Sequence, residues 1–84
     1  MTNKEILKKL IIYRSNHRGT KEMDILLGTF VKKYISTFND MDLLDLKNVL
    51  ALEDEILHRW YFDKVENKKI PENKITKLLK NFKL

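Results

Sequence analysis

A short stretch of the chain gathers the residue types that could do chemistry: an arginine, one of the two glycines and two closely spaced carboxylates. Arg18 and Gly19 come first, and Glu22 and Asp24 follow them. An exposed guanidinium beside an exposed carboxylate can form charge-assisted hydrogen bonds with a partner protein. Glu22 and Asp24 are not expected to act as a joint acid–base pair, because side chains two residues apart on a helix diverge by about 200°. If these residues have a chemical role, it is therefore binding and not catalysis.

The same residues also fit a purely local interpretation, as the junction between two helices. Glycine ends helices well because it adopts the left-handed conformation without steric cost. Acids in a first turn interact favourably with the helix dipole. When the residues are taken alone, capping is favoured over a docking site. A docking site would need an exposed Arg18 and an exposed Glu22, and it would need Gly19 both for its dihedral angles and to admit a partner's backbone.

The elements that must position this junction are helices, because apolar residues recur at steps of three and four along the chain. The expected elements are a helix from a Thr2–Glu5 capping box to Gly19, a helix over about 20–36, a helix opening at Asn39 or Asp40, a short helix after 53–55, a loop over 63–71 and a basic amphipathic helix over 72–83. No segment alternates convincingly at period two. The prediction is one all-α domain, residues 1–84, folded as a compact bundle of about five short helices.

Three positions in these helices have expected packing roles. Gly28 lies inside the second helix, where close approach of a neighbouring helix would explain a glycine. Trp60 is expected to anchor the fourth helix in the core. Tyr13 is placed on a broad apolar face of the first helix, together with Ile6, Leu7, Leu10 and Ile11.

Composition narrows the function classes. The 84 residues include no cysteine, which excludes a disulfide framework and a thiolate metal site. His17 and His58 lie too far apart for a helical ligand pair, so no metal site is predicted. No apolar run approaches the roughly 20 residues that span a bilayer, and no leader is visible. We expect a soluble protein of a bacterial cytoplasm rather than of a mitochondrial matrix.

The net charge of +5 raises a nucleic-acid-binding alternative. The two ends of the chain are cationic and the middle is anionic, but the lysines alternate with leucines and isoleucines at helical spacing, which favours solvated faces. A helix-turn-helix reader with its turn at Gly19 would place Glu22 and Asp24 where phosphates must lie. A small basic nucleic-acid-binding or regulatory module is therefore the second hypothesis. A small enzyme is remote, because no phosphate-cradling glycine loop and no glycine-flanked serine are present.

The longer context of the stretch resembles the succinate dehydrogenase assembly factor 2 family. Residues 14–30, RSNHRGTKEMDILLGTF, contain the Arg-Gly-x-x-Glu motif of that family. The similarity continues through the acidic third helix to Asp54, Leu57 and Trp60. It covers residues 6–62 well and the last helix only loosely.

The resemblance implies a five-helix bundle that is not itself an enzyme. Members bind the flavoprotein subunit of succinate dehydrogenase and, in some bacteria, of fumarate reductase, and promote covalent attachment of FAD to a histidine of that subunit. The flavin is handled by the partner, so no cofactor is expected to bind this chain stably. The free protein is expected to be a monomer that does not bind nucleic acid and does not insert into a membrane. The predicted partner-binding residues are Arg18, Gly19 and Glu22, with Asp24 beside them and His17 and Arg14 as flanking contacts.

Three departures from the family pattern lie outside that motif core. His17 stands where many relatives have arginine, Asp54-Glu55 replaces a common Asp-Pro, and Ala51 stands where an acid is often found. They bear on affinity more than on function. Because Arg18 and Glu22 are expected to be exposed, alanine at either position should lower flavinylation and leave the melting temperature nearly unchanged.

Overall fold

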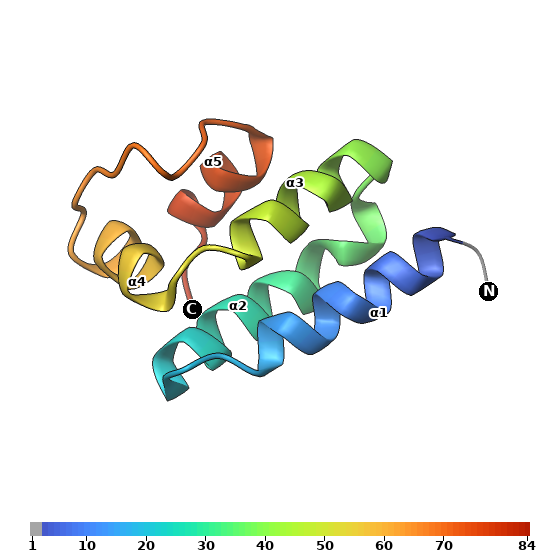
Figure 1. Ribbon diagram of the computed structural model, residues 1–84, viewed down its shortest axis with the longest axis horizontal. Helices are drawn as coiled ribbons and strands as arrows, with labels where there is room; N and C mark the ends of the chain where they lie inside the picture. Colours follow the sequence, from blue (N-terminus) through green and yellow to red (C-terminus); the bar gives the residue numbers. More distant parts are fainter. Residues whose placement is uncertain (1–2) are drawn as a thin grey trace.

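The computed structural model describes residues 3–84, and within them the chain forms five α-helices and no strand (Figure 1). The helices are α1 Asn3–Asn16, α2 Lys21–Tyr34, α3 Asp40–Leu50, α4 Asp54–Phe62 and α5 Lys74–Asn81, with a 3-10 turn, η1 Ile35–Thr37, extending α2. The prediction of an all-α bundle is confirmed. The radius of gyration is 12.1 Å, close to the roughly 12 Å expected for a compact domain of this length. The predicted Thr2–Glu5 capping box lies outside the described residues, because Thr2 does.

Side-chain caps fix where three of the helices begin. The side chain of Thr20 accepts from the Met23 amide at the start of α2. Asn39 forms a capping box with Asp42 and begins α3, and Asn73 does the same with Thr76 at α5. A capping box satisfies two amides that would otherwise lack a partner. The last helix is shorter than the predicted 72–83, because Asn73 is its N-cap and Phe82 its extended C-cap.

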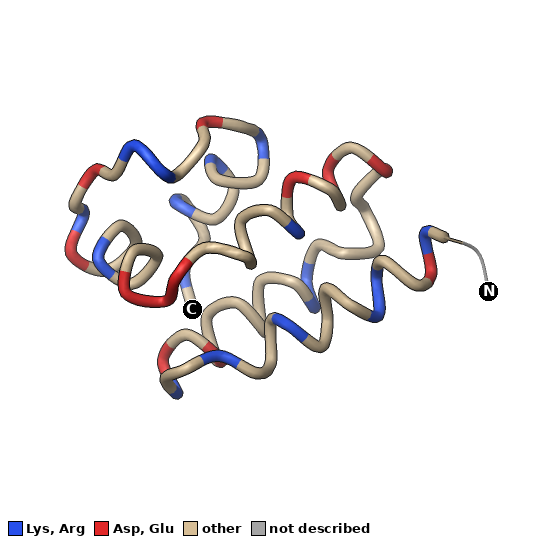
Figure 2. The backbone as a smooth tube through the Cα atoms, viewed as in Figure 1, with Lys and Arg blue, Asp and Glu red and all other residues tan. Residues whose placement is uncertain are grey.

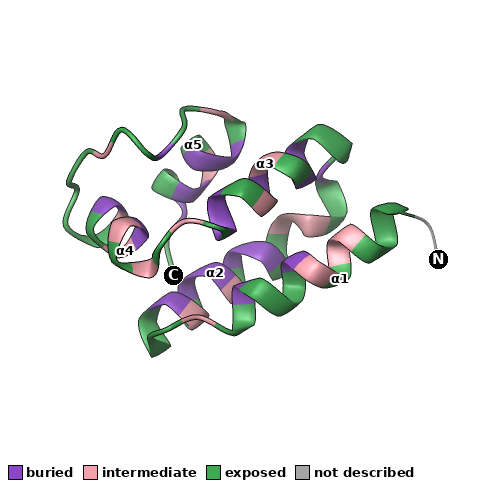
Figure 3. Ribbon diagram, in the orientation of Figure 1, coloured by how far each residue is buried: buried purple, intermediate pink, exposed green. Residues whose placement is uncertain are grey.

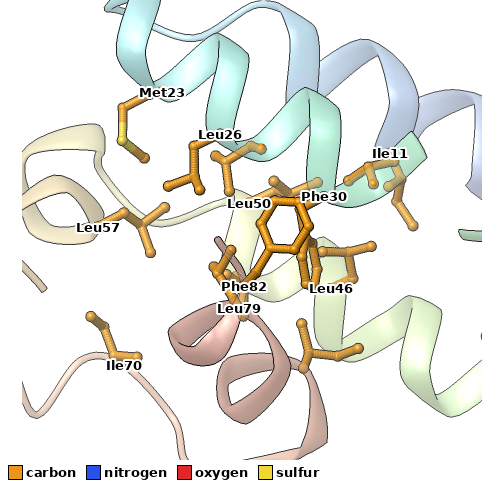
Figure 4. Close-up of a cluster of buried hydrophobic side chains, with 14 of the residues drawn as sticks. Ile11, Met23, Leu26, Phe30, Leu46, Leu50, Leu57, Ile70, Leu79 and Phe82 are labelled. Carbon is orange, nitrogen blue, oxygen red and sulfur yellow. The ribbon is translucent and has the colours of Figure 1, made fainter. Parts of the chain in front are cut away.

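The core lies between α2, α3 and α5 and is built around Phe30 (Figure 4). Phe30 is fully buried, and its ring lies 5.4 Å from that of Phe82 and 6.4 Å from that of Phe38. Trp60 is 6% exposed, which confirms its predicted place in the core. Ile70 brings the long connection between α4 and α5 into the same cluster. One continuous core therefore joins residues from α1 to the end of α5.

Helix α1 buries less than its sequence pattern indicates (Figure 3). Only Ile11 and Ser15 are buried in it, whereas Ile6 is 53% and Tyr13 60% exposed. The predicted broad apolar face is therefore wrong for Ile6 and Tyr13. The physical reason is that α1 packs on α2 and α3 through a narrow strip, so apolar residues at the edges of that face remain in solvent. Tyr13 is left on the surface near the end of α1.

Gly28 lies where α1 and α2 come close together, as predicted. A Cβ built at Gly28 would lie 2.5 Å from Oδ1 of Asn16 and 3.9 Å from the carbonyl oxygen of Ser15. An alanine here would therefore displace the exposed side chain of Asn16, whereas the backbone of α1 lies at an ordinary van der Waals distance. The glycine thus marks a close contact between the two helices, beside the segment that connects them.

A partly buried ion pair ties α3 to α5. The carboxylate of Asp42 is only 9% exposed and lies 3.1 Å from Nζ of Lys74. Asp42 also takes part in the capping box of α3, so its carboxylate has two structural tasks. This pair lies outside the predicted binding residues.

Candidate functional site

The segment that joins α1 to α2, together with the helix ends beside it, holds all six predicted binding residues; we call residues 14–24 the corner. α1 ends at Asn16, and residues 17–20 have no helical hydrogen-bond ladder of their own before α2 begins. No glycine among the described residues has a positive φ angle. The prediction that Gly19 ends the first helix in a left-handed conformation is therefore wrong. Another contact must explain the glycine.

Arg18 points inward, and its side chain is only 9% exposed. Its Nη1 donates to the carbonyl oxygen of Leu50 at 2.6 Å, and its Nη2 donates to that of Leu52 at 3.0 Å. These two carbonyls lie at the end of α3 and in the connection to α4. The expectation of an exposed guanidinium is wrong, because helix-end carbonyls in need of donors lie within reach of the arginine. Arg18 fastens the corner to the α3–α4 connection.

The carboxylate of Asp54 completes this arrangement from the first turn of α4. Its Oδ1 accepts from Nε of Arg18 at 2.7 Å and lies 2.6 Å from Nη2. Its Oδ2 accepts from the amide of Gly19 at 2.5 Å. A carboxylate at this end of a helix also interacts favourably with the helix dipole. One side chain therefore binds two successive residues of the corner.

Sequence reasoning did not assign Asp54 to the site. Two signals pointed toward it: the acidic run at residues 53–55, and its place in the family resemblance. Neither signal says which cation the carboxylate meets, because Arg18 lies 36 positions away in the sequence.

The approach of Asp54 explains why residue 19 is glycine. A Cβ built at Gly19 would lie 2.9 Å from Oδ2 of Asp54, closer than carbon and oxygen atoms pack without displacement. The close approach that the sequence suggested is therefore made by the chain's own side chain. The dihedral reason given for this glycine does not hold.

Asp24 also turns toward the corner's backbone. Its Oδ1 accepts from the amide of Arg18 at 2.5 Å, so the two successive amides of Arg18 and Gly19 both donate to carboxylates. We call this set the Arg18 cluster; its members are Arg18, Gly19, Asp24, Asp54 and the carbonyls of Leu50 and Leu52. The Arg18 guanidinium and both carboxylate oxygens of Asp54 thus have partners within the molecule.

The other three predicted residues form what we call the exposed rim: Arg14, His17 and Glu22. All three are exposed. The ring of His17 stacks on that of Tyr13 with centroids 4.0 Å apart, and its Nδ1 lies 2.7 Å from the Tyr13 carbonyl oxygen. The carboxylate of Glu22 has no hydrogen-bond or ion-pair partner among residues 3–84. The corner thus presents to the surroundings a carboxylate with no partner in the described part of the chain, next to the stacked rings of His17 and Tyr13.

Other parts of the described chain offer little for catalysis. No group of three or more metal-ligating side chains comes together within residues 3–84. His58 packs its ring against Phe62, at 4.7 Å between centroids. Among the described helices, none has the length and apolar character to cross a membrane.

Comparison with known proteins identifies the family of the chain. A sequence model of a family described as "Flavinator of succinate dehydrogenase" matches residues 9–83. The chain is 37% identical over 73 residues to a protein of Acetobacter pasteurianus named FAD assembly factor SdhE, covering 87% of this chain and 64% of that protein.

Mitochondrial relatives show the same likeness. Succinate dehydrogenase assembly factor 2 of Dictyostelium discoideum is 34% identical over 76 residues, which cover 90% of this chain and 52% of that protein. The protein of the same name from Saccharomyces cerevisiae is 30% identical over 87 residues, covering 96% and 54%. The chain therefore spans about half to two thirds of the length of these relatives. No solved structure matches.

Proposed function

We propose that this chain, which belongs to the family of flavinators of succinate dehydrogenase, binds the flavoprotein subunit of that enzyme and promotes covalent attachment of FAD to it. The relatives' names, FAD assembly factor and succinate dehydrogenase assembly factor, support this role. The observation that carries the proposal is the Arg18-Gly19…Glu22 motif within the matched residues. In the fold, that motif presents a free carboxylate beside a rigidly held corner.

The two halves of the corner have different tasks in this proposal. The exposed rim contacts the partner, with Glu22 accepting hydrogen bonds from its amides or cationic side chains. His17, stacked on Tyr13, adds an amphipathic surface, and Arg14 adds a cation. Arg18, Gly19 and Asp24 act from within by holding the corner in shape.

The chemistry belongs to the partner. We propose that FAD and the histidine that receives it are both held by the flavoprotein subunit, and that this chain acts as a chaperone that stabilises the arrangement in which they react. A binding partner of this kind favours the conformation it fits by its differential affinity for that conformation. The chain itself would then bind no cofactor stably and would not be an enzyme.

Client range, assembly and compartment are further parts of the proposal. The flavoprotein subunit of fumarate reductase is a second client by the same family resemblance, and the free chain is a monomer. The relatives come from a bacterium and from mitochondria, so a bacterial cytoplasm stays a prediction.

The nucleic-acid alternative gains no support from the charge distribution. Lysines and arginines occur on all five described helices, and acids accompany them on all but α5 (Figure 2). A binding stripe would gather its cations on one face, with few acids among them. Steep loss of DNA affinity with salt would mark that alternative, whereas an assembly factor should show no useful DNA affinity at physiological salt.

Reconstitution tests the proposed function. Purified apo-flavoprotein subunit of succinate dehydrogenase is incubated with FAD, with and without this chain, and covalent flavin is measured as fluorescence of the subunit band on a denaturing gel. The chain should increase that fluorescence. Equal fluorescence with and without the chain, using a subunit competent to accept flavin, would contradict the proposal.

A further inference from the structure

We infer that Asp54 is a positioning residue of the corner: its carboxylate fixes the backbone at Arg18 and Gly19, just before the Thr20 cap of α2, and thereby helps to set where Glu22 faces. The part of the inference that concerns partner binding rests on the proposed function. The part that concerns the backbone of the corner rests on the contacts of Asp54 alone. Asp54 itself need not touch the partner.

The geometry shows why one side chain can have this effect. Oδ2 of Asp54 binds the amide of Gly19 at 2.5 Å, while Oδ1 binds Nε of Arg18 at 2.7 Å. The backbone amide and the side chain are thus held by the two oxygens of one carboxylate. A planar guanidinium and a planar carboxylate restrict each other's orientation when they form paired hydrogen bonds. The connection between α1 and α2 cannot turn without breaking these bonds.

Glu22 depends on this arrangement through a very short connection. α2 begins at Lys21, two residues after Gly19, and Glu22 lies in its first turn. Glu22 makes no hydrogen bond or ion pair with another described side chain that would orient it. The position of its carboxylate therefore follows from where the first turn of α2 lies. The Thr20 cap and the buried Met23 hold that turn from within the helix, and the bonds at Arg18 and Gly19 hold the segment that leads into it.

The inference also explains the glycine requirement, which gives a test independent of function. In the wild-type background, Gly19→Ala places a Cβ 2.9 Å from Oδ2 of Asp54, so it should lower the unfolding midpoint. In an Asp54→Ala background the carboxylate is absent, and the same Gly19→Ala change should have much less effect. Gly28→Ala is the matched control, because its Cβ meets Asn16, so its effect should not depend on residue 54.

Asp54→Asn separates shape from charge. The amide keeps the volume of the carboxylate near Gly19 but cannot accept from Arg18 and Gly19 at both of its polar atoms. Gly19→Ala should therefore still lower the midpoint in the Asp54→Asn background. If Asp54→Ala does not fold, Asp54→Asn still provides a variant without the paired hydrogen bonds to Arg18 and Gly19.

Partner binding tests the positioning role itself. In the wild-type background, Glu22→Ala should weaken binding to the flavoprotein subunit by about tenfold, the loss of one good charged contact. In the Asp54→Asn background the corner no longer holds the Glu22 carboxylate in its binding position. Glu22→Ala should therefore weaken binding by less than about a further twofold. Asp42→Asn is the control background: it breaks another partly buried ion pair, to Lys74, and there Glu22→Ala should keep its tenfold effect.

The experiment measures, for these variants, the unfolding midpoint by circular dichroism and the affinity for the subunit by titration of folded protein. Two results would overturn the inference. One is that Gly19→Ala lowers the unfolding midpoint equally in the wild-type and Asp54→Ala backgrounds. The other is that Glu22→Ala weakens binding by the full tenfold in the Asp54→Asn background. Failure of the wild-type chain to bind the subunit would instead overturn the proposed function. In that case the unfolding data still decide whether Asp54 fixes the corner.

Discussion

The Arg18 cluster and the exposed rim come largely from one short stretch of sequence, yet they are opposite in character. In the cluster, Arg18 is 9% exposed and its donors meet Asp54 and two backbone carbonyls. In the rim, Glu22 lies in solvent with no partner among the described residues. Under the proposed function, the motif is divided: some of its residues build a rigid support and others contact the partner. Mutating the two kinds of residue should therefore give different phenotypes.

The largest expected effect is that of Arg18→Ala on stability. Removing the guanidinium leaves the carbonyls of Leu50 and Leu52 and part of the Asp54 carboxylate without donors in a partly buried place. We expect the free energy of unfolding to fall by about 2–4 kcal/mol. Urea unfolding followed by circular dichroism measures it. Arg14→Ala is the control, because Arg14 is exposed and should change stability by less than about 0.5 kcal/mol. An unchanged midpoint for Arg18→Ala would show that the cluster is not a support.

Arg18→Lys should lower the free energy of unfolding by less than Arg18→Ala does, but still measurably. An ammonium keeps the charge, but it cannot donate to two carbonyls and a carboxylate in the fixed planar directions of a guanidinium. We expect a loss of about 1–2 kcal/mol by the same unfolding measurement. Since the rim is intact, flavinylation should recover when the variant is supplied in excess. A variant that is stable but inactive at any concentration would instead indicate that Arg18 contacts the partner directly.

Glu22→Ala should give the reverse pattern. Its side chain is exposed and makes no hydrogen bond or ion pair within the described chain, so stability should change by less than about 0.5 kcal/mol. Binding to the flavoprotein subunit should weaken by about tenfold, equivalent to about 1.4 kcal/mol. The two readouts are thermal unfolding and the concentration of chain that gives half-maximal flavinylation. Undiminished flavinylation at limiting concentrations would remove Glu22 from the contact surface.

Salt concentration should have the smallest effect. It should change the binding difference caused by a mutation in the exposed rim more than the stability difference caused by a mutation in the Arg18 cluster. Exposed charges are screened beyond about 10 Å at 0.1 M salt, while buried pairs are screened much less. The binding difference between wild type and Glu22→Ala should therefore shrink between low and high salt. The stability difference between wild type and Arg18→Ala should stay within about 0.5 kcal/mol over the same range. Equal salt dependence of the two differences would contradict the division between cluster and rim.

Local signals were enough to predict most of the fold. The apolar periodicity of α2 and the Asn39 cap of α3 depend on residues three or four apart, and sequence shows such relations directly. Trp60 and Gly28 were also assigned their observed roles. The broad apolar face predicted for the first helix is wrong at Ile6 and Tyr13, because periodicity gives the direction of a face but not how much of it the neighbouring helices cover.

The candidate site was predicted in position but not in its internal arrangement. All six residues lie at the corner, but burial of Arg18 depends on Asp54 and on carbonyls more than 30 positions away. Gly19 was explained by a left-handed turn, since that is the commonest local reason for a glycine after a helix. The actual reason, the approach of Asp54, is a tertiary contact that no local pattern contains.

The most direct test of the central claim asks whether the partner covers the rim. The chain has no cysteine, so a single thiol can be introduced at Lys21, an exposed residue beside Glu22. The matched control is Met41→Cys, at a 65% exposed position in the first turn of α3. The rate of maleimide labelling of each variant is measured with and without the flavoprotein subunit. The account predicts that the subunit slows labelling at residue 21 and leaves residue 41 unchanged. Equal labelling rates at residue 21 with and without a saturating amount of subunit would contradict it.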